Sequence, residues 1–99
     1  MNQDELKRVL SLIIRRSPDY LSNIRDSVSD EQLEQLRIAG LIHIGNTFKS
    51  ETFCITQLGI DYYKDAFGYF SYLSNKLKNL YYILWTQRNT TSSTQSETK

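Results

Sequence analysis

The chain has 99 residues, near the usual size of a single domain, and 39% of them are hydrophobic, which allows a modest core. Twelve Lys and Arg face eleven Asp and Glu, so the net charge of +1 lacks the basic excess typical of nucleic-acid-binding domains. One cysteine excludes an internal disulfide framework, and without an N-terminal apolar signal segment we expect a cytoplasmic protein.

The first predicted helix begins after Asn2, whose side chain can cap the first turn, with Glu5 completing a capping box. Arg15 and Arg16 lie in its last turn, where basic residues suit the helix dipole. Apolar residues at helical spacing form one face: Leu6, Val9, Leu10, Ile13 and Ile14. This pattern predicts an amphipathic helix.

A second, short helix is predicted from Ser17 and Pro18, because Ser is a good N-cap and Pro suits the first helical position. Its apolar side would consist of Tyr20, Leu21 and Ile24.

A third helix is predicted to open at Ser29, with Gln32 at the capping-box position, and to end at Gly40. Leu33 and Leu36 are its expected inward residues, with Ile38 as a third candidate. The second and third helices would together form a helix-turn-helix unit.

A β-hairpin is predicted next, with strands at residues 41–44 and 52–55 and a polar loop between them. Because side chains alternate along a strand, Ile42 and Ile44 share one face, as do Phe53 and Ile55. We expect these faces to cover the helical core.

A last long helix is predicted from about residue 57 to 88, capped by Thr56 and with a kink at Gly68. Three- and four-residue steps connect Tyr63, Ala66, Phe70, Leu73, Leu77, Leu80 and Leu84, the spacing of a coiled-coil seam. Residues 89–99 are rich in Thr, Ser and Gln, which predicts a disordered tail. The residues predicted to form a homodimer are Phe70, Leu73, Leu77, Leu80, Tyr81 and Leu84.

The stretch Leu33…Leu36-Arg-Ile-Ala-Gly-Leu-Ile, followed by a hairpin and Ile55-Thr-Gln-Leu-Gly-Ile-Asp-Tyr-Tyr, resembles winged helix-turn-helix regulators. MarR-like and PadR-like repressors carry this pattern, as do small phage- and mobile-element-borne proteins of the YjcQ type. The resemblance implies a mainly α fold with a small β-hairpin, in the order α-α-α-β-β-α. The winged domain would span residues 1–67, and residues 68–88 would form a C-terminal dimerisation helix.

The resemblance implies a dimeric regulator that binds double-stranded DNA through its third helix and wing. Gln32 and Gln35 could bond adenine edges, and Arg37 could reach a guanine or a phosphate. Other expected contacts to the DNA backbone are Arg15, Arg16, Arg25, Asn46, Thr47 and Lys49. The alternative is a protein-interaction module that does not bind DNA and that docks through its acidic third helix or its aromatic C-terminal helix. The third helix favours it, since three carboxylates and one Arg give a charge of about −2, unsuited to DNA.

The sequence predicts no enzyme, metal site or cofactor. His43 and Cys54 would face each other on the two strands, but zinc sites normally use at least three protein ligands. We recognise no Ser-His-Asp spacing and no Gly-rich phosphate loop. The longest apolar run of the last helix, residues 80–85, is far shorter than the roughly 20 residues that span a membrane.

Overall fold

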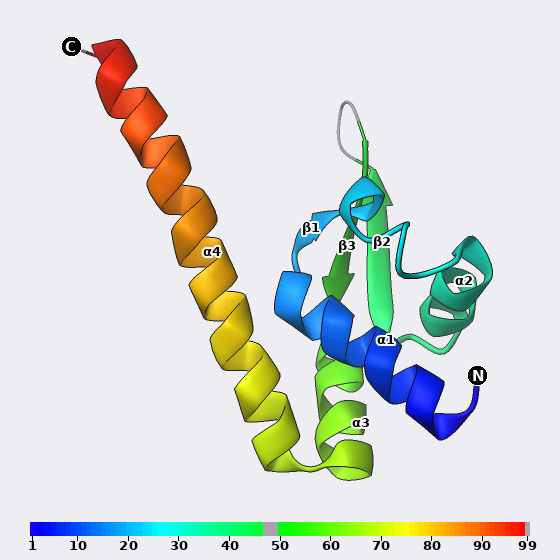
Figure 1. The fold of residues 1–99 in the computed structure, drawn as a ribbon. Coiled ribbons are helices and arrows are strands. Elements are labelled where there is room, and N and C mark those ends of the chain that lie inside the picture. Colours follow the sequence, from blue (N-terminus) through cyan, green and yellow to red (C-terminus); the bar gives the residue numbers. More distant parts are fainter. Residues whose placement is uncertain (47–49, 99) are drawn as a thin grey trace.

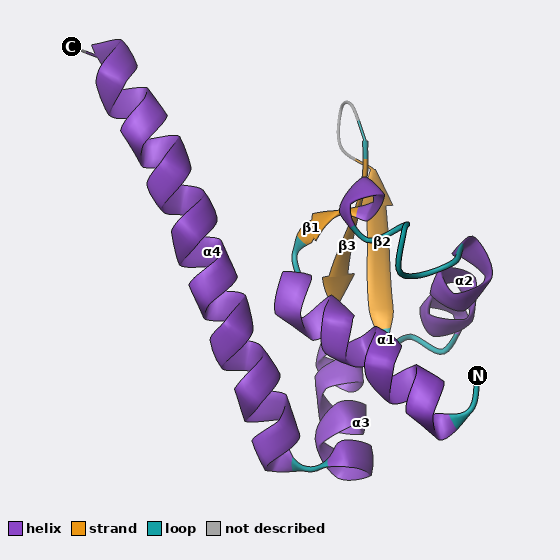
Figure 2. Ribbon diagram, viewed as in Figure 1, coloured by secondary structure: helices purple, strands orange, loops and turns teal. Residues whose placement is uncertain are grey.

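The structure is a computed structural model that describes residues 1–46 and 50–98, with side chains up to residue 86. The described part is mainly helical with a small three-stranded antiparallel sheet in the order β1-β3-β2 (Figures 1 and 2). Its elements are α1 (Gln3–Arg16), β1 (Asp19–Tyr20), the 3₁₀ helix η1 (Leu21–Asn23), α2 (Asp30–Ile38), β2 (Ile42–Asn46), β3 (Glu51–Ile55), α3 (Gln57–Phe67) and α4 (Tyr69–Thr98). This layout is compatible with a winged helix.

Helix α1 forms as its apolar periodicity predicts. The Asn2 side chain accepts a hydrogen bond from the Glu5 backbone N–H at 2.8 Å, which satisfies an otherwise free donor of the first turn. The Glu5 carboxylate, expected to close the capping box, accepts a hydrogen bond from Gln32 Nε2 at 2.6 Å. Val9, Leu10, Ile13 and Ile14 are buried, and Leu6 packs at the edge of the core.

The predicted second helix is wrong. The segment after α1 forms β1, which pairs with β3 so that Asp19 lies opposite Phe53, and then the single turn η1. Ser17 Oγ, the expected helix cap, accepts a hydrogen bond from the Ile55 backbone N–H at 2.9 Å. This contact holds the segment against the sheet, so the chain adds a third strand before Leu21 and Ile24 enter the core.

Helix α2 begins and ends where the sequence predicts. Ser29 and Gln32 form a full capping box: the Gln32 N–H donates to Ser29 Oγ, and the Ser29 N–H donates to Gln32 Oε1. Gly40 follows the helix with φ of +79°, a conformation that Gly adopts at low cost. Leu33 and Leu36 are buried, but Ile38 is 72% exposed, so the third inward candidate is wrong.

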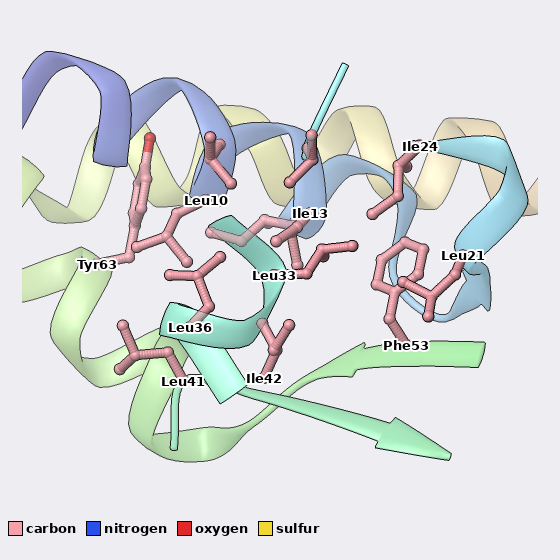
Figure 3. Packing of buried hydrophobic residues seen from close by; sticks show 13 residues of the cluster. Leu10, Ile13, Leu21, Ile24, Leu33, Leu36, Leu41, Ile42, Phe53 and Tyr63 are labelled. Carbon is pink, nitrogen blue, oxygen red and sulfur yellow. The ribbon is translucent and has the colours of Figure 1, made fainter. Parts of the chain in front are cut away.

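The hairpin of β2 and β3 has the predicted facing of its side chains. Ile42 lies opposite Ile55 and Ile44 opposite Phe53, and these four residues belong to the core or pack against it. The core lies between α1, α2 and the sheet, and Tyr63 of α3 closes one end of it (Figure 3). The loop residues 47–49 lie outside the described part of the chain.

The long final helix is divided in two, and the prediction of one continuous helix is therefore wrong. Gly68, with φ of +97°, ends α3, and the chain reverses so that α4 runs back beside α3 and α1 (Figure 1). The predicted seam therefore cannot pass from Tyr63, which is buried in the core, to Phe70. Because no Gly or Pro interrupts residues 69–98, α4 continues to Thr98, through the segment where composition predicts disorder.

Candidate interaction surfaces

One side of α4 consists of large apolar side chains that the rest of the domain leaves uncovered. We call this side the outer face. The exposed fraction of its side chains ranges from 36% at Leu73 to 82% at Phe70. Contiguous apolar surface of this kind is typical of sites that contact another molecule. Its seven residues are the six predicted for dimerisation and Trp85: Phe70, Leu73, Leu77, Leu80, Tyr81, Leu84 and Trp85.

The opposite side of α4, which we call the inner face, carries Asn75, Asn79 and Tyr82 and lies against α1. Asn79 is fully buried, and its Nδ2 donates to the backbone carbonyls of Arg15 at 3.0 Å and Ser17 at 2.7 Å. The last carbonyls of a helix lack partners within that helix. Asn79 therefore satisfies the end of α1 from a distant element.

A second buried group of polar side chains joins three helices. Tyr63 Oη of α3 lies 2.7 Å from Ser11 Oγ of α1, and it accepts a hydrogen bond from Asn75 Nδ2 at 2.9 Å. Arg15 Nη1 donates to the side-chain oxygen Oδ1 of Asn75 at 3.0 Å. Because buried polar groups need partners, this network fixes how α4 is seated on the domain.

Tyr82 continues the inner face toward the sheet. Its hydroxyl donates to Asp19 Oδ2 at 2.8 Å, and the Arg16 guanidinium lies over its ring, 4.7 Å from the centroid. This residue therefore joins α4 to β1 and to the last turn of α1.

Tyr82→Phe is expected to lower the free energy of unfolding by about 1 kcal/mol, because it removes one hydrogen bond and keeps the ring under Arg16. Urea denaturation followed by circular dichroism would measure the change. Tyr20→Phe is the matched control, since Tyr20 is an exposed tyrosine that does not belong to the outer face. Equal loss in both variants would contradict the assigned hydrogen bond.

Helix α4 differs from an ordinary surface helix in which of its two faces contacts the domain. A helix turns about 100° per residue, so Leu77 and Asn79 point to nearly opposite sides. An amphipathic helix normally buries its apolar side against its own core. Here the hydrogen bonds of the asparagines and Tyr82, together with the packing of Tyr72 at the edge of the core, hold the inner face to the domain, and the leucines face outward. The outer face is therefore not the cover of this domain's core.

The arginines predicted to contact DNA phosphates are engaged within the domain. Arg15 and Arg16 both contact the inner face of α4, as described above. Arg25 Nη2 lies 3.3 Å from a carboxylate oxygen of Glu51, and its Nε lies 3.9 Å from Asp30. Arg15 and Arg25 each use an N–H donor within the domain, and Arg16 packs its guanidinium on a ring, so each would have to leave a contact to turn fully to a phosphate.

The predicted base-reading residues of α2 are partly engaged as well. Gln32 closes the capping box and contacts Glu5, whereas Gln35 is exposed. Arg37 Nε donates to Glu34 Oε2 at 3.0 Å, and Arg37 Nη2 forms a second hydrogen bond to the same carboxylate. These hydrogen bonds lower the pKa of Glu34 and raise the pKa of Arg37. A base contact by Arg37 would have to break this pair.

The predicted DNA contacts do not gather on one surface. Asn46 is exposed at the end of β2, while Thr47 and Lys49 lie outside the described residues. Figure 1 shows α2 and α4 on opposite sides of α1, and the two α1 arginines lie with α4. The exposed side of α2 carries the acidic Asp30, Glu31 and Glu34.

An apolar groove of about 450 Å³ lies where α1, α2 and α3 meet. Leu58, which is largely exposed, forms part of its wall. The complete lining is Met1, Leu6, Gln35, Leu36, Ala39, Leu41, Leu58 and Tyr62. The Gln35 amide and the Tyr62 hydroxyl are the polar side-chain groups among these residues, so the groove offers little to orient a polar ligand.

The pairing of His43 with Cys54 across β2 and β3 is as predicted, and both side chains are exposed. In the described part of the chain, no three His, Cys, Asp or Glu residues come close enough together to hold a metal ion. Within the same part, none of the helices combines the length and the apolar character needed to span a bilayer.

Sequence reasoning did not identify the asparagines of the inner face. Asn75 and Asn79 are four residues apart and thus share one side of a helix, opposite the leucines. Two amides at this spacing, on the side away from an apolar stripe, were the available signal. Their partners Tyr63 and Ser17 are distant in sequence, and no local pattern identifies them.

Comparison with protein-family models, with curated proteins and with solved structures gave no match for this chain.

Proposed function

We propose that this protein is an interaction module, in which a winged-helix domain presents the outer face of α4 to a protein partner. The observation that carries the proposal is the opposed arrangement of α4. Its polar side is fixed by Asn75 and Asn79, and its leucines and aromatic residues face outward. Leaving so many apolar side chains in water is unfavourable, and a protein contact would remove that cost.

The composition of the outer face also favours a protein contact. Phe70, Tyr81 and Trp85 belong to residue types that are enriched in interfaces, because they combine large apolar area with few rotatable bonds. Leucines lie between them along the helix. A site that binds a polar ligand would need polar or charged side chains in place of these.

Photo-crosslinking in the cell tests the proposal. A photoreactive phenylalanine analogue at position 81, on the outer face, is expected to give discrete protein adducts. The same analogue at position 20 is the matched control, because Tyr20 is an exposed tyrosine on β1 that does not belong to the outer face. No adduct at position 81, or equal adducts at both positions, would contradict the proposal.

DNA binding is the second candidate function, and the winged-helix-like layout favours it. The helix α2 precedes the hairpin in the order that a reading helix and a wing require. The paired arginines and the acidic side of α2 place it second.

Titration of a duplex pool at about 50 mM salt tests this candidate, because phosphate contacts are strongest at low salt. If the chain binds DNA through α2, Gln35→Ala should weaken binding and Tyr20→Ala, on a different element, should not. No measurable affinity for any duplex would remove DNA binding from consideration.

A further inference from the structure

We propose that the partner of the outer face is a second copy of this chain, so that two α4 helices pair through their leucines. This inference rests on the proposed function and names the partner. The prediction from sequence was a seam that began in α3. The structure limits it to one side of α4, because α3 ends at Gly68 and Tyr63 is buried.

The size of the outer face suits a dimer. Its three aromatic side chains have about 150–250 Å² each, and the four leucines add to them. The exposed fractions are 82% for Phe70, 76% for Tyr81 and 61% for Trp85. The uncovered area therefore amounts to several hundred Å², which approaches the roughly 800 Å² that each partner contributes to a stable interface.

The spacing on the outer face favours an identical helix as the partner. Phe70, Leu73, Leu77, Leu80 and Leu84 follow each other at steps of three, four, three and four residues. This repeat lets side chains of one helix enter the spaces on a facing helix with the same repeat. A two-fold pair of such faces is closed, and it leaves no apolar surface to recruit further copies.

The charges of α4 also favour a second copy over a lipid surface. Between residues 69 and 86 the charged residues are Lys76 and Lys78, with no Asp or Glu. Helices that bind anionic membranes typically carry about 4–8 Lys and Arg. Lys76 Nζ lies 3.4 Å from Asn79 Oδ1, toward the inner face. Two outer faces can therefore meet without rows of like charge.

Light scattering of the full chain across micromolar concentrations tests this inference. We expect a mass of twice 11.6 kDa, and blue-shifted emission from Trp85, the only tryptophan, that reverts on dilution. The double variant Leu77→Asp with Leu80→Asp should raise the dimer dissociation constant at least about 100-fold. Circular dichroism would verify that the variant remains folded, and Leu77→Ala, which adds no charge, should give a smaller increase.

The matched control is the double variant Ile38→Asp with Leu58→Asp, which adds the same charges at exposed apolar residues away from α4. It should remain dimeric. A monomer at every concentration would overturn the inference, and so would dissociation of the control while the α4 variant stays dimeric. If the chain is a monomer whose position-81 adducts contain another protein, the inference fails and the proposed function stands. Without such adducts, both fail.

Discussion

Gly59→Ala is expected to lower the free energy of unfolding by about 3 kcal/mol, the largest loss that we predict for removal of a glycine. A Cβ at this position would lie 2.2 Å from the Leu41 carbonyl oxygen and 2.9 Å from Ile55 Cγ1. The first of these neighbours is backbone at the start of the hairpin, so it cannot move aside as the end of a flexible side chain could. The substitution would push α3 away from the sheet.

Helix propensity alone predicts the opposite sign for this substitution. Gly59 lies inside α3, where Ala is favoured over Gly by about 1 kcal/mol. The steric conflict with Leu41 outweighs this gain, because a carbonyl oxygen at 2.2 Å is far inside van der Waals contact. The sign of the measured change therefore decides between local propensity and tertiary packing.

Urea denaturation at a fixed protein concentration would measure the change, since the stability of the proposed dimer would depend on concentration. Gly45→Ala is the matched control: its Cβ would meet nothing closer than 3.6 Å, so a much smaller effect is expected. A Gly59→Ala protein as stable as the parent would show that α3 does not approach Leu41 as closely as described.

Asn79→Leu is expected to lower the free energy of unfolding by about 3 kcal/mol, although Leu has a similar volume and is favoured at a buried site. The substitution leaves the carbonyls of Arg15 and Ser17 without their donor. Each buried carbonyl that loses its partner costs about 1–3 kcal/mol, and the added apolar surface recovers part of this. We therefore expect α4 to separate from the end of α1 before the domain unfolds.

Urea denaturation gives the size of the effect, and hydrogen exchange shows where it arises. Amides of α4 should lose protection while those of β3 retain it. Asn46→Leu makes the same exchange at an exposed asparagine and should change the stability little. Unchanged protection of α4 in Asn79→Leu would mean that the asparagine does not hold the helix in place.

Elements with a strong local pattern could be predicted from the sequence. The spacing of apolar residues defined α1, and Ser29 with Gln32 defined the start of α2. Alternation gave the facing of Ile42 and Phe53 in the hairpin. In each case the residues that determine the structure lie within a few positions of one another.

Elements that depend on distant contacts could not be predicted in this way. The two residues of β1 are too few to form a pattern, and their pairing with β3 is held by Ser17 and Ile55, 38 residues apart. The sequence predicted a kink at Gly68, but the reversal of the chain at this residue depends on how α4 packs against α1. The leucines of the outer face were identified because their repeat is local.

The contacts of individual charged side chains were also beyond local reasoning. Arg16 suited both a phosphate contact and the end of a helix dipole, and its position over Tyr82 follows from a contact across 66 residues. Arg25 meets Glu51 only because β3 returns beside η1. The charge of these arginines is known from the sequence alone, but the groups that they contact are not.

Because Asn79 is attached to the end of α1, the spacing of residues along α4 matters as much as their type. Every later side chain points in a direction set by its distance from this asparagine, in steps of about 100° per residue. One residue inserted after Asn79 would rotate the following leucines away from Phe70 and Leu73, even if the helix stayed intact. Descendants of this chain could thus exchange one leucine for another apolar residue more readily than they could gain or lose a single position between 70 and 84.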